Sequence, residues 1–230
     1  MDAEALLEAW RRILPASVSV WAAPFAQTAA PLSAAERRSA GDIDVGRRRE
    51  LENGRQVAKR ALAALGVAAS DLPIGKDRAP QWPEGIVGSL SHAGSYVAAA
   101  VARSSAVAAL GIDVEVDGGL DPRLWGGFLN APEQARLLSV SPALRSAEAK
   151  LLWCIKEAAI KAARRRVEPP EIEVEPESSS EGVALWRIGF GIATAGRPCW
   201  HGRSIRSQGF VLAAVTVEAI PLPEETASSA

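Results

Sequence analysis

The sequence predicts an α+β protein of two similar halves, each a small antiparallel sheet packed with helices. Two observations favour this class. Helical stripes of apolar residues alternate with β-prone runs, and the order of helix, loop and strands occurs twice along the 230 residues. We therefore expect an N-terminal α+β half over residues 1–110 and a C-terminal half over residues 111–230.

The first half contains two helical regions and four β-prone runs. Leu6, Trp10 and Ile13 recur at helical spacing, which predicts a first helix. Ser33 marks the start of a second helical region, because an acid follows three residues later. The predicted elements are a helix over 3–14, a strand over 17–25, helical residues between 33 and 66, a loop over 71–85, a hairpin of strands over 86–92 and 96–102, and a neighbouring strand over 106–116.

The second half repeats this order with a turn-rich stretch, two helices and a β-prone region. Leu151, Ile155 and Ala158 give the longer helix an apolar face, so it should pack on the core. The predicted elements are turns over 117–129, helices over 131–138 and 146–166, an exposed loop or sheet edge over 168–181, and β-prone residues over 171–220.

Composition excludes several classes of protein. The chain has 26 Lys and Arg residues and 27 Asp and Glu residues, so its net charge is -1. A net charge this small would not attract the whole protein to nucleic acid or to a membrane. Two cysteines and two histidines are too few for a structural zinc site of the usual kind or for a disulfide framework. The first residues are acidic, and no apolar run reaches the ~20 residues of a membrane span. We expect a cytoplasmic protein.

Asp113 and Glu115 are the first candidates for chemistry. Alternation along a strand places both carboxylates on one face. Two carboxylates so close repel each other unless they are solvated, protonated or bridged by a cation, and Mg²⁺ prefers carboxylate oxygens. The pair is therefore either a solvated strand end or part of a site for a hard cation.

Glu157 and Lys161 are the second candidates, because a spacing of four places them on one face of a helix. As a surface pair they would stabilise the helix by only about 0.2–0.5 kcal/mol. The apolar face of the same helix points to a core setting, which counts against a simple surface pair, so the residues alone leave a structural and a functional pair both open.

Phosphate recognition is the third possibility. His92 follows a β-prone run, and Ser91 and Gly94 beside it supply a hydroxyl and open backbone suited to a phosphate. A serine hydrolase is disfavoured because no G-x-S-x-G pattern is present. Basic residues gather in the first third of the chain, as either a solvated face or phosphate ligands: Arg48, Arg55, Lys59, Arg60, Lys76 and Arg78.

The order of these motifs resembles the Sfp-type 4′-phosphopantetheinyl transferases, particularly the branch that serves siderophore synthases. The resemblance runs from about Arg48 to Lys161, through a basic helix, G-K-D-R-A-P-Q-W-P, G-S-L-S-H, G-I-D-V-E and W-C-I-K-E-A-A-I-K. It implies two α+β halves in a pseudo-twofold arrangement, coenzyme A in the cleft between them, and Mg²⁺, with Mn²⁺ as an alternative, on the pyrophosphate. Cys154 stands where many relatives carry Ser or Thr, and should face the helix interior away from the mechanism.

The resemblance also implies the roles of individual residues. It gives Glu157 and Lys161 as catalytic, Asp113, Glu115 and Glu157 as metal ligands, and Arg48, Arg55, Lys76, Arg78, Ser91 and His92 as contacts of coenzyme A. His92 is assigned to the 3′-phosphate. The resemblance does not choose between Lys76 and Arg78 in their loop, and it leaves the role of Glu133 open.

The activity implied is transfer of 4′-phosphopantetheine from coenzyme A to a serine of an apo carrier protein, of a peptide, polyketide or fatty acid synthase, with release of 3′,5′-ADP. We expect a monomer that binds neither nucleic acid nor membrane. Two alternatives are an Mg²⁺-dependent phosphohydrolase of a nucleotide-type substrate, which would need no carrier protein, and a non-catalytic adaptor, which would need no metal.

Overall fold

The computed structural model describes residues 2–27, 29–69, 71–190 and 200–219, and Cys199 lies outside these ranges. Its elements are α1 (Ala3–Ile13), β1 (Val18–Pro24), α2 (Ala34–Ala40), α3 (Val45–Ala64), β2 (Ile86–Ala93), β3 (Tyr96–Arg103), β4 (Val107–Val116), the 3₁₀ helix η1 (Pro122–Gly127), α4 (Ala131–Ser139), α5 (Pro142–Ala163), the 3₁₀ helix η2 (Pro169–Glu171), β5 (Ile172–Ser180), β6 (Val183–Phe190), β7 (Trp200–Ser207) and β8 (Phe210–Glu218). The predicted α+β class is confirmed.

Two antiparallel sheets form the fold, and they are unequal. The first has three strands in the order β1-β3-β2, and the second has five in the order β4-β8-β7-β6-β5. The hairpin of β2 and β3 forms as expected, but β4 belongs to the second sheet, where it pairs with β8. β5 is an edge strand, in agreement with the prediction for residues 168–181, and its register shifts between Pro176 and Ser178. The division of the chain at residue 110 stays a prediction.

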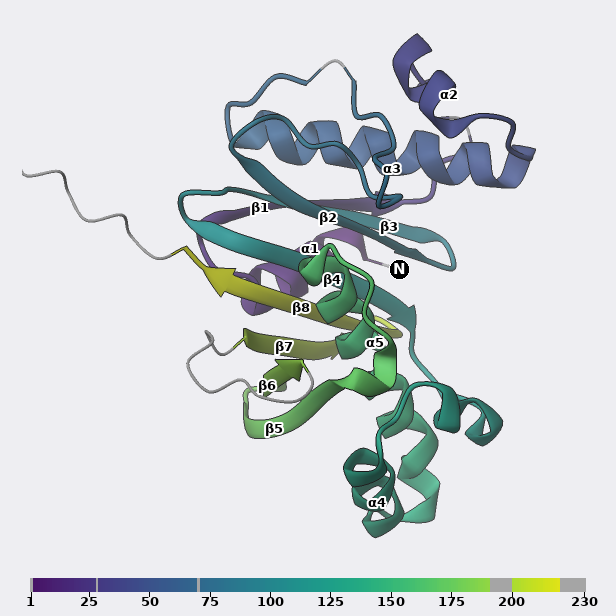
Figure 1. The fold of residues 1–230 in the computed structure, drawn as a ribbon, viewed down its shortest axis with the longest axis vertical. Coiled ribbons are helices and arrows are strands. Elements are labelled where there is room, and N and C mark those ends of the chain that lie inside the picture. The colour runs from purple at the N-terminus through teal and green to yellow at the C-terminus, as the bar shows by residue number, and fades with distance from the viewer. Residues whose placement is uncertain (1, 28, 70, 191–199, 220–230) are drawn as a thin grey trace, which may run out of the picture.

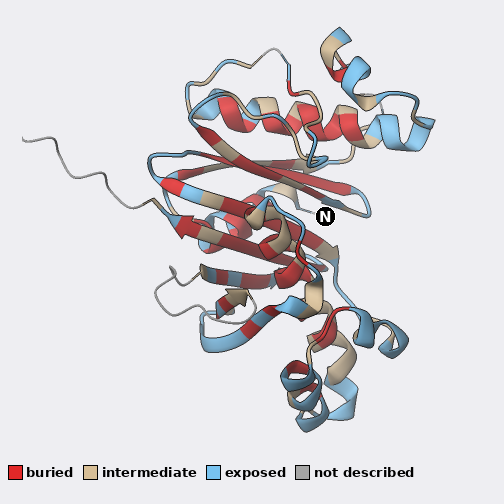
Figure 2. Ribbon diagram, in the orientation of Figure 1, coloured by how far each residue is buried: buried red, intermediate tan, exposed pale blue. Residues whose placement is uncertain are grey.

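The first sheet is covered on both faces. Val97, Ala99 and Val101 of β3 pack in one cluster with buried residues of α3. The alternate alanines of β3 join a second cluster that contains residues of α1, β4 and β8. Figure 1 shows the result, with α3 on the outer side of the first sheet and the second sheet on the other. Because both faces are covered, β3 is buried without interruption from Tyr96 to Ala102 (Figure 2).

Helix α5 covers the outer face of the second sheet. Cys154, Ile155 and Ala158 lie in one buried cluster with alternate residues of β8, as the apolar face of this helix predicts. Helix and strand approach most closely at Gly111 of β4, where an added Cβ would lie 1.9 Å from the carbonyl oxygen of Ala158. Only glycine permits this approach, which places the acids of β4 directly under α5.

Strands β2 and β4 join the two sheets through side chains. The hydroxyl of Ser89 accepts a hydrogen bond from the backbone N–H of Ile112 at 3.0 Å, and that of Ser91 accepts one from Val114 at 3.2 Å. The two strands therefore lie side by side without a backbone ladder, and the residues of the G-S-L-S-H and G-I-D-V-E motifs meet at this seam.

The helical residues between 33 and 66 form two helices. Ser33 caps α2 in a capping box with Glu36, as predicted, and Gly41 at φ 67° ends that helix before Asp44 caps α3. The buried carboxylate of Glu36 also accepts hydrogen bonds from Lys59 at 3.0 Å and from the backbone N–H of Leu72 at 3.0 Å. It ties α2, α3 and the loop over 71–85 together.

A buried ion pair fixes α5 from the other side. Lys156 is fully buried, and its ammonium contacts Glu133 at 2.7 Å and donates to the carbonyl oxygens of Phe128 and Pro169 at 2.9 Å each. Burial lowers the pKa of Lys156, and Glu133 opposes this shift. Glu133 also accepts from the backbone N–H of Val174 at 3.1 Å, so it is a structural residue that links α4, α5 and β5.

Replacing Glu133 by alanine should destabilise the fold strongly, because it leaves the charge of Lys156 buried without its partner. We expect a loss of about 3–5 kcal/mol in the free energy of unfolding, measured by urea denaturation. Glu148→Ala is the control, since Glu148 is a partly exposed residue of α5 that lies 4.0 Å from Arg206. This variant should lose less than about 1 kcal/mol. Equal losses in the two variants would contradict the assignment.

Candidate active site

A cavity of about 870 Å³ lies at the seam of the two sheets, lined by residues of α3, β2, β4, α5 and the loop over 76–80. Its charged lining is mainly basic, with Arg47, Arg55, Lys76, Arg78, Lys161, Arg164, Arg165 and Arg166 against Glu50, Asp77, Asp113 and Glu115. A concave site with this excess of positive charge suits a ligand with several negative charges.

Asp113 is buried at the floor of this cavity, with an exposed fraction of 4%. Its Oδ1 accepts hydrogen bonds from Lys161 at 2.6 Å and from the hydroxyl of Ser91 at 2.8 Å. Its Oδ2 is buried and has no hydrogen-bond partner among the described residues. A buried carboxylate oxygen without a partner is costly, so it is suited to a ligand that the cavity would receive.

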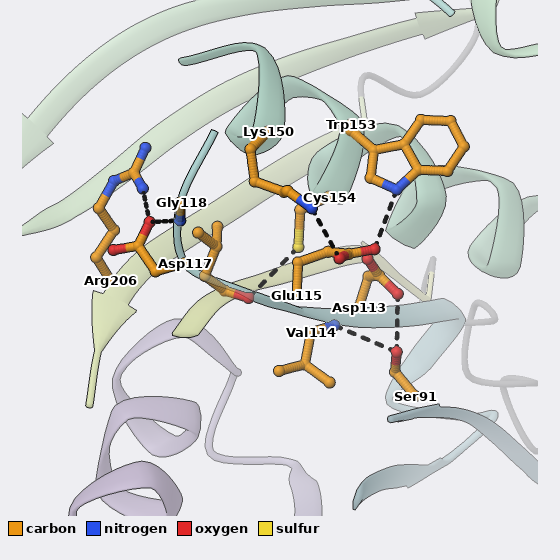
Figure 3. Close-up of polar contacts among 11 residues, drawn as sticks. Ser91, Asp113, Val114, Glu115, Asp117, Gly118, Lys150, Trp153, Cys154 and Arg206 are labelled. Carbon is orange, nitrogen blue, oxygen red and sulfur yellow. Dashed lines mark hydrogen bonds and ion pairs between the residues drawn. The ribbon is translucent and has the colours of Figure 1, made fainter. Parts of the chain in front are cut away.

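Glu115 lies on the same side of β4 and is held by α5. Its Oε2 accepts from the ammonium of Lys150 at 3.2 Å, and its Oε1 accepts from the indole N–H of Trp153 at 3.1 Å (Figure 3). Neither Lys150 nor Trp153 was expected in the site from the sequence. The signal was present, because Lys150, Trp153 and Glu157 are spaced by three and four residues and so share one helical face.

Glu157 is half-buried beside these two acids, although it is not among the residues that line the cavity. Burial raises the pKa of Glu157, the charges of Asp113 and Glu115 raise it further, and Lys161 opposes them. The three predicted ligands are thus close enough to interact electrostatically. A glutamate in such a position gains basicity, and it also gains from any cation nearby.

These acids do not form a closed metal site as they stand. Within the described part of the chain, no group of three or more His, Cys, Asp or Glu residues is arranged to hold a metal ion. The donor set nevertheless fits a hard divalent cation, because Oδ2 of Asp113 lacks a partner and Glu157 is destabilised by its negative neighbours.

Arg55 is the most deeply buried base of the cavity, with an exposed fraction of 5%. Its Nε has no hydrogen-bond partner among the described residues. Burial lowers the pKa of Arg55, Glu36 opposes the shift, and Arg47 adds to it. The guanidinium remains charged because arginine titrates far above neutral pH, so an anion in the cavity would relieve its burial.

Not every predicted basic residue reaches the cavity. Arg48 is exposed and does not line it, whereas Arg47, one position earlier, does. Lys76 and Arg78 both line it, so position alone does not choose between them. Arg78 adopts φ 64°, in the left-handed region that residues other than glycine rarely occupy, and such backbone is frequent at functional sites.

An ion pair spans the cavity from the first half to the second. Arg164, at the C-terminal end of α5, donates two hydrogen bonds to Oδ2 of Asp77, at 3.0 and 2.6 Å. Although burial acts to raise it, these bonds hold the pKa of Asp77 below its ordinary value. The run Arg164 to Arg166 was included in the predicted helix without a role, yet all three residues line the cavity.

His92 and Ser91 point to opposite faces of β2. His92 is exposed in the cavity, with its Nε2 3.7 Å from Glu50 and its ring edge-on to Phe25. Ser91 is buried and faces β4. The two residues therefore belong to different parts of the site, although they are adjacent in sequence.

Cys154 lies in the interior, as expected, and donates from its thiol to the carbonyl oxygen of Val211 at 3.6 Å (Figure 3). Burial raises the pKa of this thiol, and the charge of Asp113 adds to the effect. The group is therefore a neutral thiol and not a nucleophile.

Comparison with known proteins gives matches over both halves. Residues 41–102 match the 4′-phosphopantetheinyl transferase N-terminal domain, and residues 109–215 match the 4′-phosphopantetheinyl transferase superfamily. The chain is 30% identical to the 4′-phosphopantetheinyl transferase Svp of Streptomyces mobaraensis over 178 residues, which are 74% of this chain and 72% of that protein.

Two further relatives match shorter segments. The 4′-phosphopantetheinyl transferase Npt of Nocardia iowensis is 39% identical over 116 residues, 50% of this chain and 51% of its own length, so the match spans about half of that relative. Enterobactin synthase component D of Salmonella typhi is 41% identical over 73 residues, 30% of this chain and 29% of its own. With matching segments in both halves and more than two thirds of Svp covered, the chain belongs to the 4′-phosphopantetheinyl transferase family.

Proposed function

We propose that this chain transfers 4′-phosphopantetheine from coenzyme A to a serine hydroxyl of an apo carrier protein. The observation that carries the proposal is the meeting, in one cavity, of the Asp113–Lys161 pair with a wall of basic side chains. The Asp113–Lys161 pair supplies groups for phosphoryl transfer, and the basic side chains supply counter-charges for a ligand with a pyrophosphate and a further phosphate.

The basic residues divide into inner and outer groups. Arg55 is buried and suited to a phosphate that is removed from water, whereas Lys76, Arg78 and His92 are exposed on the cavity wall. We assign His92 to the 3′-phosphate of coenzyme A, since a histidine beside a phosphate is stabilised in its charged form. Arg48 is an outlying candidate that a ligand would reach only from the rim.

Asp113, Glu115 and Glu157 would hold a divalent cation, Mg²⁺ with Mn²⁺ as an alternative. When bound, the cation would neutralise charge on the pyrophosphate. The unpartnered oxygen of Asp113 supports this role most directly. Glu115 would have to share its oxygens with Lys150 and Trp153, which hold it in place.

The chain's own residues supply proton transfer and charge stabilisation. The serine oxygen of the carrier protein forms a bond to the β-phosphorus, and the bond from that phosphorus to the bridging oxygen breaks, so that 3′,5′-ADP leaves with the electron pair. Glu157 accepts the serine proton, a role for which its raised pKa makes it a stronger base than an ordinary glutamate. Lys161 spends two donors on Asp113 and Ser91, and its third is available to the phosphate.

The carrier protein, of a peptide, polyketide or fatty acid synthase, is the proposed partner, with coenzyme A as the second substrate. A monomeric state and a cytoplasmic location stay predictions. Across the residues that the structure describes, no helix has both the length and the apolar character needed to cross a membrane. A phosphohydrolase would use the same acids but would deliver water, so the product distinguishes the two reactions.

Incubation with coenzyme A, Mg²⁺ and an apo carrier protein should add one phosphopantetheine group to the carrier serine, as detected by intact-protein mass spectrometry. Removal of divalent cations with EDTA should abolish the gain, and added Mg²⁺ should restore it. The matched control is a carrier protein whose acceptor serine is alanine. Release of 3′,5′-ADP at the same rate with this control would show hydrolysis and overturn the proposal.

Glu157→Gln should reduce the rate of transfer by about 10²–10⁴-fold, the usual loss for a general base, because the amide cannot accept the serine proton. The melting temperature should change little, since the substitution preserves volume. Glu148→Gln on the same helix should transfer at the wild-type rate, because Glu148 lies 4.0 Å from Arg206 and, unlike Glu157, is not coupled to Asp113 and Glu115. If excess Mg²⁺ restores the Glu157 variant fully, the residue is only a metal ligand and the base assignment is wrong.

His92→Ala should weaken coenzyme A binding much more than dephospho-coenzyme A binding, because only the former carries the 3′-phosphate. Isothermal titration calorimetry with both ligands measures the difference. His201→Ala is the matched control, since His201 lies on β7 away from the cavity. Equal weakening of the two ligands by His92→Ala would remove the 3′-phosphate assignment.

A further inference from the structure

The hydroxyl of Ser91 uses all of its hydrogen-bonding capacity inside the protein. It donates to Oδ1 of Asp113 at 2.8 Å, and it accepts from the backbone N–H of Val114 at 3.2 Å and from the ammonium of Lys161 at 3.0 Å. A serine hydroxyl has one donor and two acceptor positions, so none is left over. The residue is also buried, with an exposed fraction of 6%.

We propose that Ser91 is a positioning residue for Asp113 and Lys161, and not a contact of coenzyme A. This inference rests on the proposed function, because it concerns the residues assigned there to the metal and the reacting phosphate. A hydroxyl that bound the nucleotide would have to give up one of three internal bonds, two of which involve charged groups. Charge-assisted bonds are the stronger ones, so the internal arrangement is favoured.

The geometry also shows what Ser91 positions. Both Ser91 and Lys161 bind Oδ1 of Asp113, and Oδ2 is left without a partner. The two donors thus fix the rotation of the carboxylate, and with it the position of Oδ2. They also hold Lys161 at that carboxylate, with one N–H of the ammonium still available.

Ser89 provides an internal comparison. It lies two residues earlier on the same face of β2, it is equally buried, and its hydroxyl accepts a backbone N–H of β4 in the same way as that of Ser91. Among the hydrogen bonds of the described residues, however, it makes none to Asp113 or Lys161. The two serines therefore share the seam between the sheets, and only Ser91 reaches the charged groups.

The test compares Ser91→Ala with Ser89→Ala. Loss of a residue that orients a metal ligand typically reduces metal affinity or activity by about 10–100-fold. We expect Ser91→Ala to weaken Mn²⁺ binding, followed by electron paramagnetic resonance in the presence of coenzyme A, and to lower kcat, each by about that factor. Ser89→Ala should stay within about threefold of wild type in both measurements, and it should lose less melting temperature than Ser91→Ala because it gives up one hydrogen bond against three.

Coenzyme A binding measured without divalent cation distinguishes a positioning role of Ser91 from a direct contact with coenzyme A. Calorimetry should give the same affinity for Ser91→Ala and wild type, within about twofold, and Ser91→Thr should recover Mn²⁺ affinity because it retains the hydroxyl. A tenfold loss of coenzyme A affinity without cation, or equal loss of Mn²⁺ affinity in both alanine variants, would overturn the proposal. The binding measurements do not require turnover. They therefore test the role of Ser91 even if the wild-type protein shows no transferase activity, and the two proposals can fail separately.

Discussion

The close approach of α5 to β4 is the constraint on which the rest of the site depends. At Gly111 the strand has no side chain, and the helix backbone occupies the space that a Cβ would need. The acids two and four residues later are therefore covered by the helix, within reach of its lysines and tryptophan. A larger residue at Gly111 would separate the two elements and remove every one of these contacts at once.

Two neighbouring residues of helix α5 face different environments, one structural and one in the candidate site. Lys156 faces a buried pocket in which Glu133 and two carbonyl oxygens take its three protons, whereas Glu157, the next residue, faces the acids of β4. A fully paired Lys156 fixes the rotation of the helix about its axis, since any turn would leave a buried charge exposed to apolar surroundings. The buried pair of Lys156 and Glu133 thus fixes the position of Glu157 on a different face of the helix.

The sequence predicted most elements, because local periodicity and capping determine them, and most of its candidate site residues line the cavity. It did not predict the pairing of β4 with β8, since strand partners depend on contacts about a hundred residues apart. Nor did it predict that Arg55 would be buried while Arg48 stays exposed, because both lie on one charge-dense helix whose solvated side only the packed fold defines.

The seam between the sheets also bears on aggregation. β2 and β4 are the edge strands at which the sheets meet, and serine hydroxyls take N–H groups that a foreign strand would otherwise pair with. At the far edge of the second sheet, β5 is interrupted by Pro176 and carries Glu173, Glu175 and Glu177. A second copy that aligned its own β5 there would bring like charges together along the strand, so the fold resists growth by strand addition at both ends of this sheet.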